Sequence, residues 1–223
     1  MKLGHLAVTA LSAGMLFGAT EADKRLDAAA DAMHDIMAAP DKGIPQDLLQ
    51  KSACIVVVPG LKKGAFIVGG KFGRGFIVCR KGGAGWSAPA AVKVEGGSVG
   101  FQIGGSETDV VLLVMNQGGV KKLLASKFTV GADANAAIGP VGRDSSAATD
   151  AQLHAEILTY SRSRGAFAGV SLEGATLRPD QDANEELYGK KMSNSDVVLG
   201  DVQAPPAAGK LLGELNKYSS RRG

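Results

Sequence analysis

The chemistry that stands out in this sequence is a long basic stretch without a carboxylate. Between Asp47 and Glu95 the chain carries eight Lys and Arg residues and no Asp or Glu. These bases are Lys51, Lys62, Lys63, Lys71, Arg74, Arg80, Lys81 and Lys93. A surface that presents bases without compensating acids holds a positive potential, and such a potential attracts anions. The stretch therefore predicts an anion-binding surface.

Signals for catalysis or for a metal are weak by comparison. None of the three His residues stands in a nucleophile motif such as G-x-S-x-G, and no Cys/His cluster indicates a metal site. Residues 69–75, G-G-K-F-G-R-G, have the composition of a phosphate-binding loop but neither the dinucleotide nor the Walker spacing. We therefore expect no enzyme, no cofactor and no metal. A hydrolase that uses His154 is the least favoured alternative.

The basic residues lie among short strands that Gly and Pro separate. Apolar runs rich in β-branched residues are typical of strands joined by tight turns, and the 31 glycines favour many short strands over long helices. The predicted strands cover residues 55–58, 65–68, 76–79, 90–94, 99–103, 109–115, 128–130 and 134–138, with a hairpin of 155–161 and 166–172. Turns are expected at residues 69–75 and 95–97.

Helices are predicted where apolar residues recur at helical spacing. They cover residues 23–38, 46–51, 117–127, 180–187 and 210–218. The first carries a stripe of like charge, formed by Asp23, Asp27, Asp31 and Asp35, on the side opposite its apolar face. An anionic surface would repel this side, so we expect the helix to pack on the core. The predicted fold class is α+β, a mostly antiparallel sheet, barrel-like in its curvature, with flanking helices.

The N-terminal 22 residues have the pattern of an export signal. Lys2 precedes an apolar run, and small residues at positions 20 and 22 precede Asp23. A buried N-terminal helix is the alternative. We expect a signal peptide at 1–22, a single domain at 23–200, and a linker with a C-terminal helix at 201–223. The protein would then be exported, and periplasmic or associated with the outer membrane or cell surface.

The two cysteines, Cys54 and Cys79, both lie in predicted strands. In an oxidising compartment they can form a disulfide if the strands are neighbours. Otherwise they serve as small buried apolar residues. The sequence leaves both alternatives open.

Lipid head groups and nucleic acids are the anions to compare. Each base close to an anionic membrane contributes about 1 kcal/mol, so four or five bases presented together contribute roughly 4–5 kcal/mol. Among the bases only Phe72 offers an aromatic platform of the kind that single-stranded nucleic acids require. The expected partner is therefore an anionic phospholipid surface and not a nucleic acid. An unknown protein partner is the alternative.

Several segments in order across residues 50–190 resemble the SYLF domain family. They read V-V-V-P-G-L-K-K-G-A-F-I-V-G-G-K-F-G-R-G, W-S-A-P-A, G-F-Q-I-G-G, D-V-V-L-L-V-M-N, A-I-G-P-V-G-R, Y-S-R-S-R-G-A-F-A-G-V-S-L-E-G and N-E-E-L-Y-G. The resemblance implies a lipid-binding domain with phosphoinositide ligands, which in eukaryotic members is joined to SH3 or FYVE modules and linked to actin and endocytosis. Together with the export signal it implies a stand-alone bacterial member.

The predicted function is non-catalytic binding of anionic, phosphoinositide-like phospholipid head groups by the basic Gly-rich sheet. The phosphate contacts are expected from Lys62 and Lys63, which follow Pro59-Gly60, and from Lys71 and Arg74. Second-line candidates are Arg80, Lys81, Arg162 and Arg164. Lysines act as point charges and arginines can bind bidentately. The alternative is an envelope structural or protein-interaction module without lipid specificity.

Overall fold

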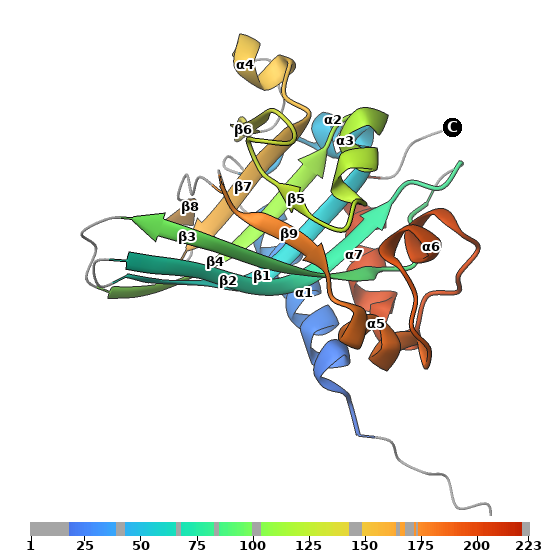
Figure 1. Ribbon diagram of the computed structural model, residues 1–223. Helices are drawn as coiled ribbons and strands as arrows, with labels where there is room; N and C mark the ends of the chain where they lie inside the picture. The colour runs from blue at the N-terminus through green and yellow to red at the C-terminus, as the bar shows by residue number, and fades with distance from the viewer. Residues whose placement is uncertain are drawn as a thin grey trace, which may run out of the picture.

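The strands form one curved sheet, shown in the computed structural model of Figure 1. The structure describes residues 18–38, 43–65, 68–82, 85–99, 104–142, 149–163, 166–167, 172 and 174–219. The strands are β1 Cys54–Ala65, β2 Val68–Cys79, β3 Ala90–Val99, β4 Gly104–Val114, β5 Phe128–Thr129, β6 Ala136–Ile138, β7 Ile157–Ser163, β8 Ala166–Phe167 and β9 Thr176–Pro179. Their order is β5-β9-β3-β2-β1-β4-β7-β6, with β8 on β7. Among the described strands only β6 and β7 pair in parallel, so the predicted fold class is confirmed.

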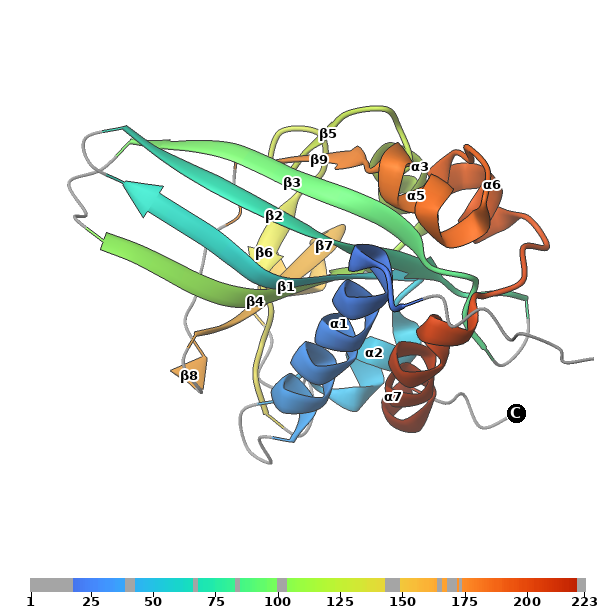
Figure 2. The same cartoon turned by 90° about the horizontal axis from the view of Figure 1, so that it is seen from below.

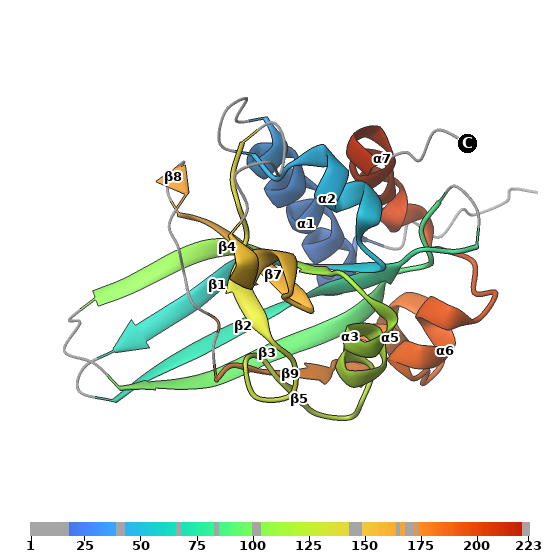
Figure 3. The ribbon, with the colours of Figure 1, turned by 90° about the horizontal axis from the view of Figure 1, so that it is seen from above.

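Helices cover both faces of the sheet (Figures 2 and 3). They are α1 Glu21–Met37, α2 Gln46–Lys51, α3 Gln117–Leu123, α4 Asp150–Leu153, α5 Gln181–Tyr188, α6 Asn194–Leu199, the 3₁₀ turn η1 Pro206–Ala208 and α7 Gly209–Ser219. We call the face under α1, α2 and α7 the α1 face, and the face under α3 and α6 the α6 face. No described helix is both long enough and apolar enough to cross a bilayer.

Alternation along β1 explains why the sheet needs cover on both sides. Ile55 and Val57 point into the core on the α1 face, whereas Cys54, Val56 and Val58 point into the core on the α6 face. Successive side chains of a strand point to opposite faces, so an unbroken apolar run requires two cores. The same holds for β4, where residues 110–114 are all buried. The apolar runs of the sequence are therefore the central strands of a covered sheet.

Two predicted turns in the glycine-rich region are wrong. Residues 69–75 lie inside β2 and residues 95–97 lie inside β3. Glycine weakens a strand, but here each segment is hydrogen-bonded to neighbouring strands, and this pairing outweighs the local preference. Of the predicted strand at 99–103, residues 100–103 lie outside the described residues, and β4 begins at Gly104.

Other boundaries differ because tertiary pairing sets them. The helix predicted at 117–127 ends at Leu123. Strand β9 and helix α6 were missed, because they are short segments stabilised by contacts with β3 and with the core on the α6 face.

Helix α1 begins one residue after Thr20, whose side chain forms a capping box with Asp23. The predicted signal peptide falls largely on residues 1–17, outside the described residues, and stays a prediction.

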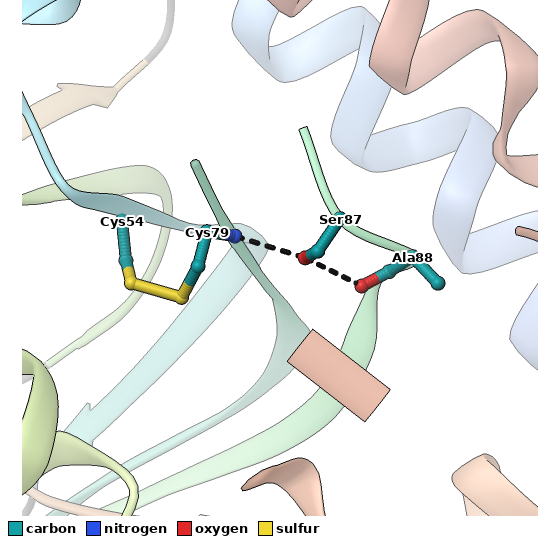
Figure 4. The surroundings of a disulfide bond; sticks show 4 residues. All are labelled: Cys54, Cys79, Ser87 and Ala88. Atoms are coloured by element: carbon teal, nitrogen blue, oxygen red, sulfur yellow. Dashed lines mark hydrogen bonds between the residues drawn. A yellow bond between two sulfur atoms is a disulfide. The ribbon is translucent and has the colours of Figure 1, made fainter. Parts of the chain in front are cut away.

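A disulfide joins Cys54 at the start of β1 to Cys79 at the end of β2 (Figure 4). The two residues are direct partners in the register and both are buried. The Cys79 amide donates to Ser87 Oγ at 3.0 Å, and Ser87 Oγ donates to the Ala88 carbonyl at 2.9 Å. The bond therefore closes the covered end of the β1–β2 hairpin, and the structure favours the disulfide alternative.

We predict that Cys54→Ala/Cys79→Ala lowers the free energy of unfolding by about 3 kcal/mol, because the loop that the bond closes spans 25 residues of sequence separation. Urea unfolding with and without a reductant measures the change. Reductant should lower the stability of the wild type to that of the variant and leave the variant unchanged. Equal stability of the oxidised wild type and the variant would contradict the structural role of the bond.

Candidate functional site

Strands β1–β4 continue past the covered core as one four-stranded extension, in which the β1–β2 hairpin lies between β3 and β4 (Figures 1 and 2). We call residues 62–65, 68–74, 93–99 and 104–107 the distal hairpins. A bulge at Pro59-Gly60, where the register shifts, separates this part of β1 from the buried part. The ladder continues beyond it to Ala65, which pairs with Gly69 and Gly104. The distal hairpins therefore form a thin sheet held by backbone hydrogen bonds.

Glycines occupy a whole row across the distal hairpins. Gly105, Gly64, Gly70 and Gly97 are neighbours on four adjacent strands. A Cβ atom at Gly64 or Gly97 would meet nothing within 4 Å. Packing among the described residues therefore does not require glycine at these two positions. Close approach of another molecule to the backbone is a further use of glycine.

The four main candidate bases lie on the distal hairpins but on two different faces. Lys62 and Arg74 point to the α1 face, where Lys62 is paired with Phe72 and Glu107. Lys63 and Lys71 are direct partners on the opposite face. Partial burial and then the charge of Lys71 lower the pKa of Lys63. These four residues lie at the same end of the sheet, but they do not form a single patch.

Arg80 lies at the opposite end of the sheet and has a structural role. Its guanidinium stacks on Trp86 at 3.8 Å from the ring centroid and donates to the carbonyls of Leu49 and Ser219 at 3.1 and 2.8 Å. Trp86 Nε1 donates to Ser219 Oγ at 3.2 Å. Arg80 therefore ties the end of α7 to the sheet, and Trp86 is a packing anchor.

Three of the candidate bases, one main and two second-line, have acidic partners from distant parts of the chain. Lys81 pairs with Asp201 at 2.9 Å and Arg162 pairs with Asp35 at 3.0 Å. Arg74 Nε lies 3.5 Å from Oδ2 of the fully buried Asp180. The expectation that the basic stretch has no compensating carboxylate is therefore wrong for Arg74 and Lys81. The acids are absent nearby in the sequence but are supplied by the fold. Arg164 lies outside the described residues.

Sequence reasoning missed one basic row. Arg74, Lys93 and Arg178 are lateral neighbours on β2, β3 and β9, all on the α1 face. Lys93 and Arg178 have no ion-pair partner within the described part of the chain. Arg178 lies far from the basic stretch in the sequence, and only the pairing of β9 with β3 brings it there. No sequence signal other than a correct strand assignment would have found it.

A cavity of about 600 Å³ lies between α1 and the distal hairpins. Its charged lining includes Arg25 of α1 and Arg74 of β2 on one side, Glu107, Asp109 and Arg162 on the other, and Lys62 of β1 between them. The acidic stripe of α1 also contributes: Asp31, which pairs with Lys210 at 2.8 Å, and Asp35, which pairs with Arg162. The stripe is therefore not simply solvated, as the sequence suggested, because two of its members bind bases from α7 and β7.

Asp109 is the most perturbed carboxyl group of this cavity. Burial raises its pKa, and the charges of Asp35 and Glu107 act in the same direction. A hydrogen bond of 2.9 Å from the Gly60 amide and the charge of Arg162 oppose the shift. The side chain is thus held in place by the bulge of β1 in an environment that disfavours its charged form.

The N-E-E-L-Y-G segment serves the fold. Asn184 accepts from the Ala91 amide at 2.7 Å and donates to Asn194 at 2.8 Å, which joins α5 and α6 to β3. Tyr188 donates to the Pro89 carbonyl, and Gly189 ends α5 at a φ of 69°, which favours glycine. Within the described ranges no group of His, Cys, Asp and Glu side chains is arranged to bind a metal ion.

Comparison with known protein families gives one match. Residues 95–218, more than half of the chain, match the Ysc84 family, described as "Las17-binding protein actin regulator". The matched region begins within β3 and ends within α7.

Curated relatives extend the similarity towards the N-terminus. The chain is 32% identical over 183 residues to human SH3 domain-containing YSC84-like protein 1, covering 82% of this chain and 53% of that protein. It is 35% identical over 176 residues to LAS seventeen-binding protein 3 of Saccharomyces cerevisiae, covering 77% and 38%. It thus spans about half or less of the length of these relatives.

We predict that Arg80→Lys lowers the free energy of unfolding by roughly 2 kcal/mol, because the charge is kept but the hydrogen bonds to two carbonyls and the stacking on Trp86 are weakened. Urea unfolding measures the change. Arg178→Lys, an exposed control, should change stability by less than about 0.5 kcal/mol. Equal effects of the two substitutions would show that Arg80 does not hold α7.

We predict that Asp109→Asn removes a pH-dependent cost of folding. The pKa of Asp109 is raised in the folded state, so the native protein binds this proton more tightly, and stability falls as pH rises from the ordinary value of 3.8 through the folded pKa. The variant should be at least as stable as the wild type at neutral pH, and its advantage should shrink on acidification. Unfolding midpoints across this range measure it, with Glu95→Gln as the control. A variant that is less stable at every pH would contradict this account.

Proposed function

Because the chain belongs to the Ysc84/SYLF family, we propose that it binds anionic, phosphoinositide-like phospholipid head groups through its distal hairpins and that it does so without catalysis. The relatives' names associate them with SH3 domains and Las17 binding. Whole-protein activities of those longer chains are not carried over. The proposal rests on the charge and exposure of the distal hairpins.

The observation that carries the proposal is the charge excess at this end of the sheet. The described residues of the distal hairpins include five bases, Lys62, Lys63, Lys71, Arg74 and Lys93, and two acids, Glu95 and Glu107. Counted together with the buried Asp180, which pairs with Arg74, the excess is two positive charges. The connecting residues 66–67 and 100–103 carry no charge in the sequence. The acids of α1 do not cancel the excess at the tip, because Asp31 and Asp35 bind Lys210 and Arg162.

An end-on approach reconciles this charge with the split between two faces. The distal hairpins are a single layer, so a membrane that meets their end is within reach of lysines on both sides of the sheet. Lys63 lies two residues from the end of β1, and Lys71 three residues from the start of β2. At about 3.3 Å per residue these positions are roughly 7–10 Å from the strand ends. Lysine side chains extend along apolar surface and keep their amines in the polar layer.

The glycine row supports close contact between the hairpins and a surface. Gly64 and Gly97 leave the backbone uncovered on the side where a Cβ would otherwise stand. Phe72, half exposed on the same face, offers apolar area next to Lys62. A combination of bases with a small apolar contact is typical of reversible membrane binding. Export to the periplasm or cell surface, and bacterial origin, remain part of the proposal.

A protein-interaction module is the second candidate. The family description, "Las17-binding protein actin regulator", favours it. This alternative predicts that the protein does not bind vesicles. It also predicts that a partner protein still binds the variant in which the distal lysines are replaced.

The test is co-sedimentation with vesicles of phosphatidylcholine alone, with phosphatidylglycerol, and with a phosphoinositide. We predict that Lys62→Gln/Lys63→Gln/Lys71→Gln weakens binding to both anionic compositions about 100-fold, because three bases contribute about 1 kcal/mol each. Lys121→Gln/Lys127→Gln/Lys190→Gln is the matched control, since it removes the same charge from exposed positions elsewhere. Its binding should stay within a few fold of the wild type.

Two results would refute the lipid proposal. One is equal binding of the wild type to neutral and anionic vesicles. The other is an equal loss of binding in the distal variant and in the control, because this would show that net charge matters and the distal hairpins do not. Raising the salt concentration should weaken wild-type binding, since exposed charges are screened.

A further inference from the structure

The cavity between α1 and the distal hairpins has charges of opposite sign at its two ends. Helix α1 crosses the sheet above it. Near its start, the Ala22 amide lies 3.3 Å from Glu186 of α5, and near its end Asp35 pairs with Arg162 of β7. Arg25 and Asp35 are ten residues apart, about 15 Å along the helix axis. The lining therefore runs from the α5 side to the β7 side.

The end near α5 is basic. Arg25 and Arg74 line it. Asp180, fully buried, lies 3.5 Å from Arg74 Nε, and neither of its carboxylate oxygens has a hydrogen-bond partner in the described structure. The carboxylate of Asp180 orients the guanidinium of Arg74 through Nε. The two terminal nitrogens of that guanidinium remain available to an oxyanion. Arg25 has no ion-pair partner among the described residues.

The end near β7 is acidic. Asp35, Glu107 and Asp109 meet there, Arg162 pairs with Asp35, and Lys62 of β1, the register partner of Glu107, lies between this end and Arg74. The carboxylate of Glu107 lies against Gly60: a Cβ atom added at Gly60 would be 2.5 Å from Glu107 Oε1. Gly60 has a φ of 57° and its amide donates to Asp109. The bulge thus brings two carboxylates to the same side of the cavity.

The charged groups of the two ends do not pair with each other, because Arg74 and Asp109 are each held by a different neighbouring group. Arg74 is held by Asp180, and Asp109 by the Gly60 amide. No described ion pair crosses the cavity from Arg25 or Arg74 to Glu107 or Asp109. Strands β2 and β4 are separated by β1, and the register places Phe72, two residues before Arg74, level with Glu107, so Arg74 and Glu107 stand about 12 Å apart at the backbone.

We propose that this cavity binds a small zwitterion that carries an oxyanion and a primary ammonium group, with the oxyanion at Arg25 and Arg74 and the ammonium at Glu107 and Asp109. Free phosphoethanolamine and the head group of phosphatidylethanolamine share this chemistry. A zwitterion places a counter-charge at both ends, whereas phosphate alone places none at Glu107 and Asp109, and ethanolamine alone places none at Arg25 and Arg74. The cavity shares Lys62 and Arg74 with the distal hairpins, whereas Lys63 and Lys71 belong to the distal hairpins but do not line the cavity.

Isothermal titration calorimetry with O-phosphoethanolamine tests the proposal, with inorganic phosphate, ethanolamine and phosphocholine as comparison ligands. The zwitterion should bind at least about tenfold more tightly than phosphate or ethanolamine alone. Phosphocholine should bind more weakly than phosphoethanolamine, because its trimethylated nitrogen cannot donate hydrogen bonds to a carboxylate. Equal affinity for phosphate and phosphoethanolamine, or no binding of the zwitterion, would overturn the proposal.

Variants assign the two ends. Arg25→Gln and Glu107→Gln should each weaken binding of phosphoethanolamine at least about tenfold, and neither residue has an ion-pair partner among the described residues whose loss would disturb the fold. The matched controls are Arg178→Gln and Glu95→Gln, which remove the same charges from exposed positions outside the cavity. Unchanged affinity in Arg25→Gln and Glu107→Gln would overturn the site.

The experiment separates this site from the anionic-lipid function. Lys63→Gln/Lys71→Gln lies outside the cavity lining, so it should weaken binding to anionic vesicles and keep the affinity for phosphoethanolamine. Glu107→Gln should show the reverse. If wild-type protein also sediments with neutral vesicles that contain phosphatidylethanolamine, and Glu107→Gln does not, the ligand is the lipid head group. If only the soluble zwitterion binds, the ligand is the free compound.

Discussion

The hydrogen-bonded ladder of β1 with β2 and β4 is the constraint on which the rest of the structure depends. β1 is the central strand, and it pairs on both sides from Cys54 to Ala65. Its first half is buried between two helical layers. Its second half has little side-chain packing and is held by pairing with β2 and β4. The covered half, closed by the disulfide at Cys54, therefore supports a half that can be rich in glycine and charge without losing its geometry.

The bulge at Pro59-Gly60 sets which residues meet at the functional surfaces. It shifts the register between Val58 and Leu61, so that Lys62 faces α1 and Lys63 faces away. The same bulge places the Gly60 amide on Asp109 and leaves room for Glu107. One local irregularity thus separates two surfaces: the end of the hairpins, with an excess of lysine, and the cavity beneath α1, with both signs of charge.

The sequence was sufficient to predict what depends on local pattern. The buried runs, the helix expected at 23–38 and the antiparallel sheet follow from alternation and helical spacing, whereas the N-cap at Thr20 was not predicted. It was insufficient where pairing decides. Residues 69–75 contain four glycines yet lie within a strand, because β1 and β3 flank them. Two bases of the basic stretch, Arg74 and Lys81, pair with Asp180 and Asp201, which lie more than 100 residues away in the sequence, so the sequence did not show these partners.

Amide hydrogen exchange in the presence of anionic vesicles tests the central claim most directly. The account predicts slower exchange in residues 62–74 and 93–107, which include the distal hairpins, and no change when the vesicles are neutral. Residues near Arg80 and α7 should exchange at the same rate in both cases, because they lie at the opposite end of the sheet. Protection confined to α7 or α6, or no protection of the distal hairpins, would contradict it.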